Sequence, residues 1–203
     1  MSQTETFMQG EGDAWFKRNR TQLGKNDPVS DLIKSMDWAP ESVLEIGCGT
    51  GWRLKKLHEE YGCDIAGIDP SGIAIQELGN CGCQGTADSL PFLSNQFDTV
   101  IFGFCLYLIE PKDLFRVVAE SDRVLRNGGV LIVHDFMPSP YPFKRRYKHA
   151  PDVWAYHFDY RKLWLGHPDY ISAAWQYDAD RDEAVIGFLK SPGASFPERK
   201  DER

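Results

Sequence analysis

The feature that most constrains the fold is a short apolar run that leads directly into three glycines at alternate positions. Residues 43–46 are apolar or β-branched except for one acid, Glu45, and Gly47, Gly49 and Gly51 follow. Such a run predicts a strand buried on both faces, and residues 52–60 then have the pattern of a helix. Glycine turns tightly and lets a ligand approach bare backbone, and the helix start directs free N–H groups at that turn. We therefore expect a strand, a glycine turn and a helix that hold a ligand carrying a nucleoside.

The glycine spacing and two acids near it distinguish between such ligands. The dinucleotide fingerprint is G-x-G-x-x-G, whereas this chain has G-x-G-x-G. Glu45 would repel a pyrophosphate but attract the ammonium and sulfonium groups of S-adenosylmethionine. A second buried strand, residues 65–69, ends in Asp69, whose two oxygens suit the two hydroxyls of a ribose. These residues favour S-adenosylmethionine and leave a nicotinamide-dependent oxidoreductase as an alternative.

Five segments resemble the motifs of one family, in the order in which that family has them. They are residues 43–51, 65–69, 86–92, 97–100 and 123–131. On these segments the chain resembles the class I S-adenosylmethionine-dependent methyltransferases, and the resemblance extends over about two thirds of the sequence. It implies methyl transfer with S-adenosyl-L-methionine as the cofactor. A non-catalytic, regulatory protein that binds the same cofactor is the other alternative.

The resemblance also assigns residues to the cofactor. Asp88 would accept a hydrogen bond from the adenine amino group, with Ser89 beside it. Trp15 resembles the aromatic residue that several members of the family place over the cofactor. The complete expected set is Trp15, Glu45, Gly47, Gly49, Gly51, Asp69, Asp88 and Ser89.

The alternation of strand and helix patterns predicts an α/β fold with one Rossmann-like, doubly wound, mostly parallel sheet. We expect strands at residues 42–46, 64–68, 84–86, 97–102 and 130–135, and helices from Asp27-Pro28 and at residues 52–61, 71–78 and 111–125. Residues 171–177 and 183–189 read as a hairpin, one strand of which must be antiparallel to the rest. A single domain is expected over residues 1–203, with residues 1–9 and 191–203 disordered.

The connection between the fifth strand and this hairpin is unusually long and aromatic. It covers residues 137–170, about 34 positions, and is too rich in Trp, Tyr and Phe for disorder. Inserted segments of this length are commonly functional lids. We expect a folded cap over the carboxyl ends of the strands, where ligands bind in open α/β sheets.

Methyl transfer requires an aligned nucleophile and often a base that removes its proton. Histidine titrates near neutral pH, so His134 at the end of the fifth strand and His157 in the cap are the candidate catalytic bases. We expect Tyr107, Asp135 and Arg145 to contact the acceptor. Catalysis by alignment alone, without a base, stays open.

The acceptor class is narrowed by what the sequence lacks. Residues 103–107 stand where amino-directed DNA methyltransferases of this fold carry an Asn/Asp-Pro-Pro-aromatic run, and the chain contains no Pro-Cys dipeptide. The net charge of −7 also disfavours a broad phosphate-binding face. We expect a small-molecule acceptor methylated on oxygen or nitrogen, and no nucleic acid. The basic run 144–146 suits an acidic acceptor. Residues 12–19 are similar to methylases associated with bacterial surface-sugar biosynthesis, which suggests a sugar-linked one.

The remaining expectations concern location. The five cysteines show no zinc-binding spacing, so we expect reduced thiols, no metal and a cytoplasmic protein. No apolar run approaches the roughly 20 residues of a membrane span. The first residues lack the features of a signal peptide.

Overall fold

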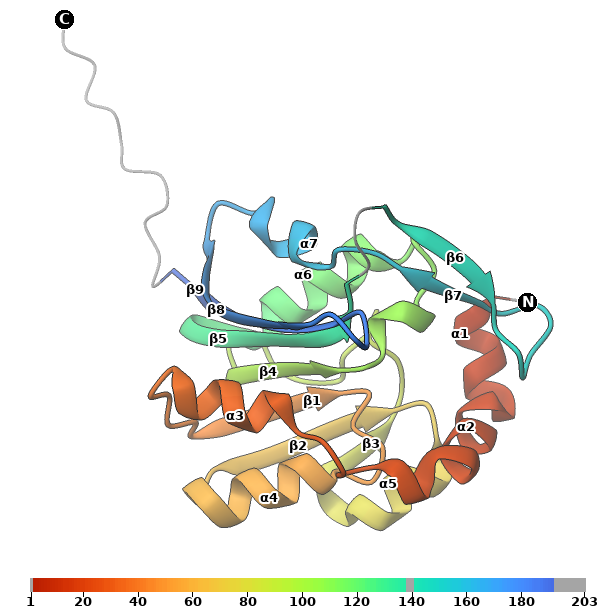
Figure 1. Ribbon diagram of the computed structural model, residues 1–203. Helices are drawn as coiled ribbons and strands as arrows, with labels where there is room; N and C mark the ends of the chain where they lie inside the picture. Colours follow the sequence, from red (N-terminus) through yellow and green to blue (C-terminus); the bar gives the residue numbers. More distant parts are fainter. Residues whose placement is uncertain (1, 138–140, 192–203) are drawn as a thin grey trace, which may run out of the picture.

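The computed structural model describes residues 2–137 and 141–191, which form one seven-stranded sheet with helices on both faces (Figure 1). The order of the strands across the sheet is β3-β2-β1-β4-β5-β9-β8. Their bounds are β1 (Ser42–Ile46), β2 (Asp64–Asp69), β3 (Gly82–Gln84), β4 (Phe97–Gly103), β5 (Leu125–Phe136), β8 (Tyr170–Asp178) and β9 (Glu183–Lys190).

The strand directions confirm the predicted doubly wound sheet. β1 to β5 are parallel to one another, β9 is antiparallel to β5, and β8 is antiparallel to β9. The chain moves outward in one direction from β1 to β3 and in the other from β4 to β5. The ends of β1 and β4 therefore form the switch point at which a ligand crevice is expected.

Two helical layers bury the sheet (Figure 1). The helices α3 (Pro28–Ser35), α4 (Trp52–Tyr61) and α5 (Gly72–Leu78) cover one face, and α6 (Leu114–Val124) and α7 (Arg161–Leu165) cover the other. Because side chains alternate along a strand, Ile101 faces the first layer and Phe102 the second. On the second face Phe102 contacts the fully buried Trp164 of α7, with ring centroids 5.4 Å apart.

Several element boundaries differ from the sequence prediction. The helix expected from Pro111 begins at Leu114, because residues 110–113 form turns before it. β5 begins at Leu125 rather than Val130, and β3 ends at Gln84. The start of α3 is as predicted: Asp27 caps the helix by accepting from the Ser30 N–H at 3.3 Å, and Pro28 follows.

The prediction of disorder for residues 1–9 was wrong for the described residues 2–9. Ser2 caps α1 (Gln3–Thr6), and the π-helical turn η1 (Phe7–Glu11) follows and leads into α2 (Gly12–Asn19). The buried side chain of Gln3 donates to the carbonyl oxygens of Leu108 and Trp154 and accepts from the Trp154 N–H, at 2.8–3.1 Å. These contacts come from distant parts of the chain, so local composition could not reveal them. The other predicted disorder lies almost wholly in residues 192–203, outside the described part.

The aromatic segment after β5 has two structural parts. β6 (Phe143–Arg146) and β7 (Trp154–His157) form a separate antiparallel hairpin near α1, while α7 joins the helical layer beside α6 (Figure 1). Residues of the β6–β7 hairpin, which belongs to the predicted cap, pack against Phe7 of the N-terminal helices. No helix among residues 2–137 and 141–191 is long and apolar enough to cross a membrane.

Candidate active site

The glycine turn after β1 is held in a conformation that favours glycine. Gly47, Gly49 and Gly51 have φ values of 75°, 53° and 65°, in the left-handed region. The Gly47 and Cys48 N–H groups donate to the Ile68 carbonyl oxygen at 2.8 and 3.2 Å, which ties the turn to β2. Gly51 is the N-cap of α4. The turn therefore presents bare backbone at the carboxyl edge of the sheet.

A cavity of about 680 Å³ lies over this edge. It brings together eight of the thirteen site residues predicted from the sequence: Trp15, Glu45, Gly47, Gly49, Asp69, Asp88, Tyr107 and His134. Within the described part of the chain, five predicted residues are not among those that line it: Gly51, Ser89, Asp135, Arg145 and His157.

Asp69 is positioned by backbone hydrogen bonds to both of its oxygens. Oδ2 accepts from the Gly49 N–H at 2.9 Å and Oδ1 from the Ser71 N–H at 2.8 Å. Burial raises the pKa of Asp69 despite these two bonds, and the nearby Asp13 adds to the rise. A carboxylate oxygen can accept more than one hydrogen bond, so both oxygens can still accept from a ligand diol.

Asp88 lies in the loop that follows β3. Its carboxylate is 3.6 Å from Arg116, which is largely exposed, so solvent weakens this ion pair. Ser89 is exposed, and its N–H donates to the Thr86 carbonyl oxygen at 3.3 Å. The structure thus places Asp88 at the cavity and Ser89 away from it.

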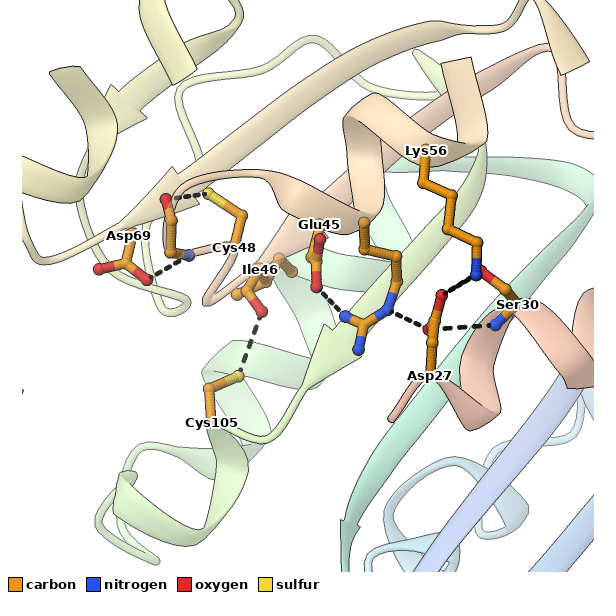
Figure 2. Close-up of polar contacts among 10 residues, drawn as sticks. Asp27, Ser30, Glu45, Ile46, Cys48, Lys56, Asp69 and Cys105 are labelled. Carbon is orange, nitrogen blue, oxygen red and sulfur yellow. Dashed lines mark hydrogen bonds and ion pairs between the residues drawn. The ribbon is translucent and has the colours of Figure 1, made fainter. Parts of the chain in front are cut away.

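Glu45 has a partner that the sequence analysis missed. Its Oε1 atom pairs with Arg53 Nη1, and Arg53 Nε in turn contacts Asp27 Oδ1 at 2.9 Å (Figure 2). Arg53 and Glu45 are both buried and both line the cavity. Arg53 was overlooked because it lies inside a regular helix pattern, where a basic residue usually faces solvent. Gly103 makes room for the pair, because a Cβ there would lie 2.6 Å from each side chain.

The second oxygen of Glu45 gives a direct test of whether a cationic ligand fits. Glu45 Oε2 is buried and has no hydrogen-bond partner within residues 2–137 and 141–191. Burial raises the pKa of Glu45 to about 7, against the opposing effect of Arg53. A buried acceptor without a partner is unfavourable. A donor such as an ammonium group in the cavity would satisfy this atom, so the residues present fit such a ligand.

An aromatic cluster forms the part of the site beyond β4 and β5. Phe104 directly follows β4 and has a φ of 63°, which is uncommon for a bulky residue. Its ring lies edge-on to the rings of His134, Phe136 and Tyr107, with centroids 4.8, 4.8 and 5.8 Å apart. Strained backbone of this kind is often found at functional sites. Phe104, Tyr107 and His134 line the cavity.

His134 has an acidic neighbour that the sequence analysis also missed. Its Nε2 atom is 3.5 Å from Oε2 of Glu183, and Oε1 of Glu183 is 3.3 Å from Nε of Arg181. Burial lowers the pKa of His134, although Glu183 opposes the shift. Both neighbours come from the C-terminal hairpin, and only its register against β5 could have revealed them.

Asp135 was predicted to contact the acceptor, but the structure gives its carboxylate a different environment. Oδ2 accepts from the N–H groups of Leu106 and Tyr107, at 2.8 and 3.3 Å, and Oδ1 accepts from the Phe136 N–H at 2.8 Å. Burial raises the pKa of Asp135 to about 7. The Asp135 carboxylate thus binds the backbone of the loop after β4 and is not among the residues that line the cavity.

His157 and Arg145, also predicted as site residues, lie on the β6–β7 hairpin outside the cavity lining. The His157 ring stacks on Phe143 at 4.5 Å and lies 4.2 Å from the Phe136 ring. Burial lowers the pKa of His157 to about 4. Arg145 is exposed and lies 5.8 Å over the Phe136 ring. Both side chains contact Phe136, which is itself not among the residues that line the cavity.

The N-terminal helices supply one wall of the cavity, which includes Trp15 and Phe7. Asp13 anchors this wall by accepting from the Ser71 hydroxyl at 2.7 Å and the Ile73 N–H at 3.1 Å. Gly12 allows the close approach, because a Cβ there would lie 3.0 Å from the Ser71 nitrogen. Within the described residues, no group of three or more His, Cys, Asp or Glu could hold a metal ion.

Comparison with known proteins shows which proteins the chain is similar to. Residues 44–133 match a methyltransferase domain family. The chain is 33% identical over 138 residues to the ubiquinone/menaquinone biosynthesis C-methyltransferase UbiE of Hahella chejuensis, covering 62% of this chain and 53% of that protein. It is 32% identical to the tRNA N(3)-methylcytidine methyltransferase Mettl2 of Drosophila melanogaster, over 48% of this chain and 35% of that protein. It thus spans about half the length, or less, of these curated relatives.

A solved structure supports the fold over nearly the whole chain. The 1,6-didemethyltoxoflavin-N1-methyltransferase of Burkholderia thailandensis superposes with a TM-score of 0.73 at 16% identity, over 92% of this chain and 88% of that one. The order of the strands is that of a doubly wound sheet, and the glycine turn lies within the segment that matches the methyltransferase domain. Residues 44–133 are thus similar to a methyltransferase domain, and the structure places them in a doubly wound sheet.

Proposed function

We propose that the protein uses S-adenosyl-L-methionine to methylate a small molecule on oxygen or nitrogen. The single observation that carries the proposal is that Glu45 Oε2 has no hydrogen-bond partner in the described part of the chain. It lies at a cavity that the glycine turn and Asp69 also line. The comparison with the Burkholderia enzyme, whose structure contains S-adenosylhomocysteine, supports the same cofactor.

Each side of the cavity has a part in this function. Asp69 would hold the ribose hydroxyls, Asp88 the adenine amino group and Glu45 the ammonium group, while Trp15 closes the site from the N-terminal wall. When bound, the cofactor supplies an electrophilic methyl group, which the protein must align with the acceptor. The rings of Phe104 and Tyr107 make the acceptor side largely apolar.

The proposed acceptor class rests on the net charge of the chain and on the basic residues of the β6–β7 hairpin. The net charge of −7 favours a small molecule over nucleic acid, although one relative acts on tRNA. Lys144 and Arg146 lie 4.4 and 4.8 Å over the Trp154 ring, and Arg145 lies 5.8 Å over the Phe136 ring. This basic hairpin supports an acidic or sugar-linked acceptor. All five cysteines are free thiols, which supports a location in the cytoplasm.

The first experiment tests the cofactor with three parallel samples. Thermal unfolding is followed with S-adenosylhomocysteine, with NAD and without ligand, because a ligand that binds the folded state raises its stability. We expect S-adenosylhomocysteine alone to raise the Tm. A rise with NAD alone would instead support an oxidoreductase and overturn the proposal.

The second experiment tests transfer. The protein is incubated with isotope-labelled S-adenosylmethionine and either a small-molecule extract or total tRNA, and methylated products are identified by mass spectrometry. Label in a small molecule is the expected result. Label in tRNA alone would refute the small-molecule acceptor, and cofactor binding without any turnover would favour the regulatory alternative.

A further inference from the structure

Glu183 is the first residue of β9 and lies beside the end of β5. Its side chain there approaches the His134 ring. In the antiparallel register Glu183 lies opposite Phe136, and His134 lies opposite Val185. The Glu183 Oε2 atom is 3.5 Å from His134 Nε2, and the two side chains are only 13% and 9% exposed. Both residues line the cavity. A carboxylate and an imidazole are therefore paired at the edge of the acceptor side.

The chain around Glu183 fixes the position of its carboxylate. Asp182, which precedes it, has a φ of 53°, and its carbonyl oxygen accepts from the Met137 N–H at 2.8 Å. This bond joins the hairpin turn to the residue that follows β5. Arg181 Nε contacts the other Glu183 oxygen at 3.3 Å. Glu183 is thus held beside His134 on a structured turn.

The pair determines which ring nitrogen of His134 carries hydrogen. A carboxylate accepts hydrogen bonds, so Nε2 beside Glu183 is the protonated nitrogen of the neutral ring. Nδ1 is then the nitrogen with a free lone pair. Within residues 2–137 and 141–191, Nδ1 makes no hydrogen bond, and its ring meets Phe104 edge-on at 4.8 Å. A distance of 3.5 Å is long for the Nε2 bond, but such bonds often shorten when a ligand binds.

The charged groups around the ring come from three other elements. Glu183 of β9 and Asp27 at the start of α3 raise the pKa of His134, whereas Arg53 of α4 and burial lower it. Burial is the largest effect, so the pKa is below its usual value. The ring is therefore neutral near pH 7, which is the form that can take up a proton.

We propose that Glu183 is a positioning residue that holds His134 with Nδ1 free, as the proton acceptor for a hydroxyl group of the acceptor. This inference rests on the proposed methyl transfer. As the acceptor oxygen bonds to the methyl carbon, the carbon–sulfur bond breaks and the hydroxyl proton moves to Nδ1. The positive charge of the sulfonium thus ends on the imidazolium, beside the Glu183 carboxylate. A neutral amine can attack through its lone pair before it loses a proton, so the pair favours oxygen over nitrogen.

Nuclear magnetic resonance of histidine labelled with ¹⁵N tests the pair without an acceptor. The samples are wild type, Glu183→Gln, Glu120→Gln as the control and His134→Asn for assignment. Glu120 pairs with Arg123 on α6, outside the cavity lining, so its variant makes the same charge change elsewhere. We expect the Nε2–H form of His134 in the wild type. In Glu183→Gln we expect its pKa to fall by about one unit, and in Glu120→Gln no change.

The outcomes separate this inference from the cofactor assignment. A wild-type His134 in the Nδ1–H form would overturn the pairing even if no variant folded, and so would an unchanged pKa in Glu183→Gln. Calorimetry with S-adenosylhomocysteine on the same wild-type sample tests the proposed function separately. The methylated atom of the product is the second readout: oxygen is expected, and nitrogen or carbon would contradict the role in proton removal.

Discussion

At the scale of single residues, Gly49 is where cofactor binding depends most directly on backbone conformation. It has a φ of 53° and donates its N–H to Asp69. Gly49→Val introduces a β-branched side chain that rarely adopts this conformation, and it displaces the N–H groups of the turn. We expect calorimetry to show loss of S-adenosylhomocysteine binding by the folded variant.

The matched control for this change is Gly62→Val. Gly62 has a φ of 69° at the end of α4, nothing lies within 4 Å of a Cβ built there, and it is not among the residues that line the cavity. It should lose stability to similar strain and still bind S-adenosylhomocysteine. Equal binding by both variants would mean that the glycine turn does not hold the cofactor.

The two candidate bases are distinguished by kinetics. His134 lines the cavity, whereas His157 is stacked between Phe143 and Phe136 outside its lining. A positioned base contributes roughly 10²–10⁴-fold. We therefore expect His134→Asn to lower kcat by about a hundredfold or more. The variant should also lose the acidic limb of the pH profile, which lies below the usual histidine pKa because burial lowers the pKa of His134. His157→Asn should act mainly on stability. If both variants stay within a few-fold of wild type, alignment alone explains catalysis.

The sequence revealed the parts of the site that belong to local motifs. Glu45 and Asp69 end predicted strands, so their place at the carboxyl edge followed from the pattern. Glu183 did not, because its contact with His134 depends on an antiparallel register between distant segments. Asp135 was assigned to the acceptor because the sequence could not show that the loop at Leu106 folds back and binds its carboxylate.

At the scale of elements, Gln3 joins the N-terminal helices to the β6–β7 hairpin. Gln3→Ala would leave the Trp154 N–H and two carbonyl oxygens without this partner. An unsatisfied buried group costs about 1–3 kcal/mol. We expect a Tm lower by several degrees and faster hydrogen exchange in residues 143–157. Gln76→Ala on the exposed side of α5 is the control. Unchanged exchange in Gln3→Ala would show that the hairpin is held by other contacts.

The elements that the sequence predicted well are those with strong local signals. β1 and α4 have the predicted bounds because an apolar run, three glycines and a helical pattern define them. The two parts of the aromatic segment were not separable, since Trp164 and Trp154 look alike in sequence. The structure buries Trp164 against Phe102 and leaves the other on the small hairpin. Which tryptophan is buried against the sheet depends on tertiary packing, and amino-acid composition does not reveal it.

At the scale of the whole molecule, Asp135 makes stability depend on pH. Its pKa rises from 3.8 in the unfolded chain to about 7 in the folded protein, because of burial. The folded state therefore binds more protons between these values. The contribution of Asp135 is complete below about pH 4 and is lost as the pH rises through 7, by at most about 1.4 kcal/mol per pH unit.

Chemical denaturation at pH 5 and pH 8 tests this dependence. The wild type should have a smaller free energy of unfolding at pH 8, and Asp135→Asn should show a weaker decrease because it cannot ionise. Asp64→Asn, at an exposed position, should behave like the wild type. An equal decrease in Asp135→Asn would assign the pH dependence to other groups.

The contact between Gln3 and Trp154 has a consequence for how the protein is made. The two residues are 151 positions apart, yet their hydrogen bonds fix the wall that contains Phe7 and Trp15. A ribosome releases the first of these residues long before the second, and contacts of large sequence separation form late because loop closure precedes them. The glycine turn and Asp69 can assemble on the nascent chain, but Gln3 can bond to the hairpin, beside the wall that lines the cavity, only after Trp154 has been synthesised. A chain stalled before residue 154 should therefore carry the glycine turn and Asp69 but lack the contact that holds the N-terminal wall of the cavity in place.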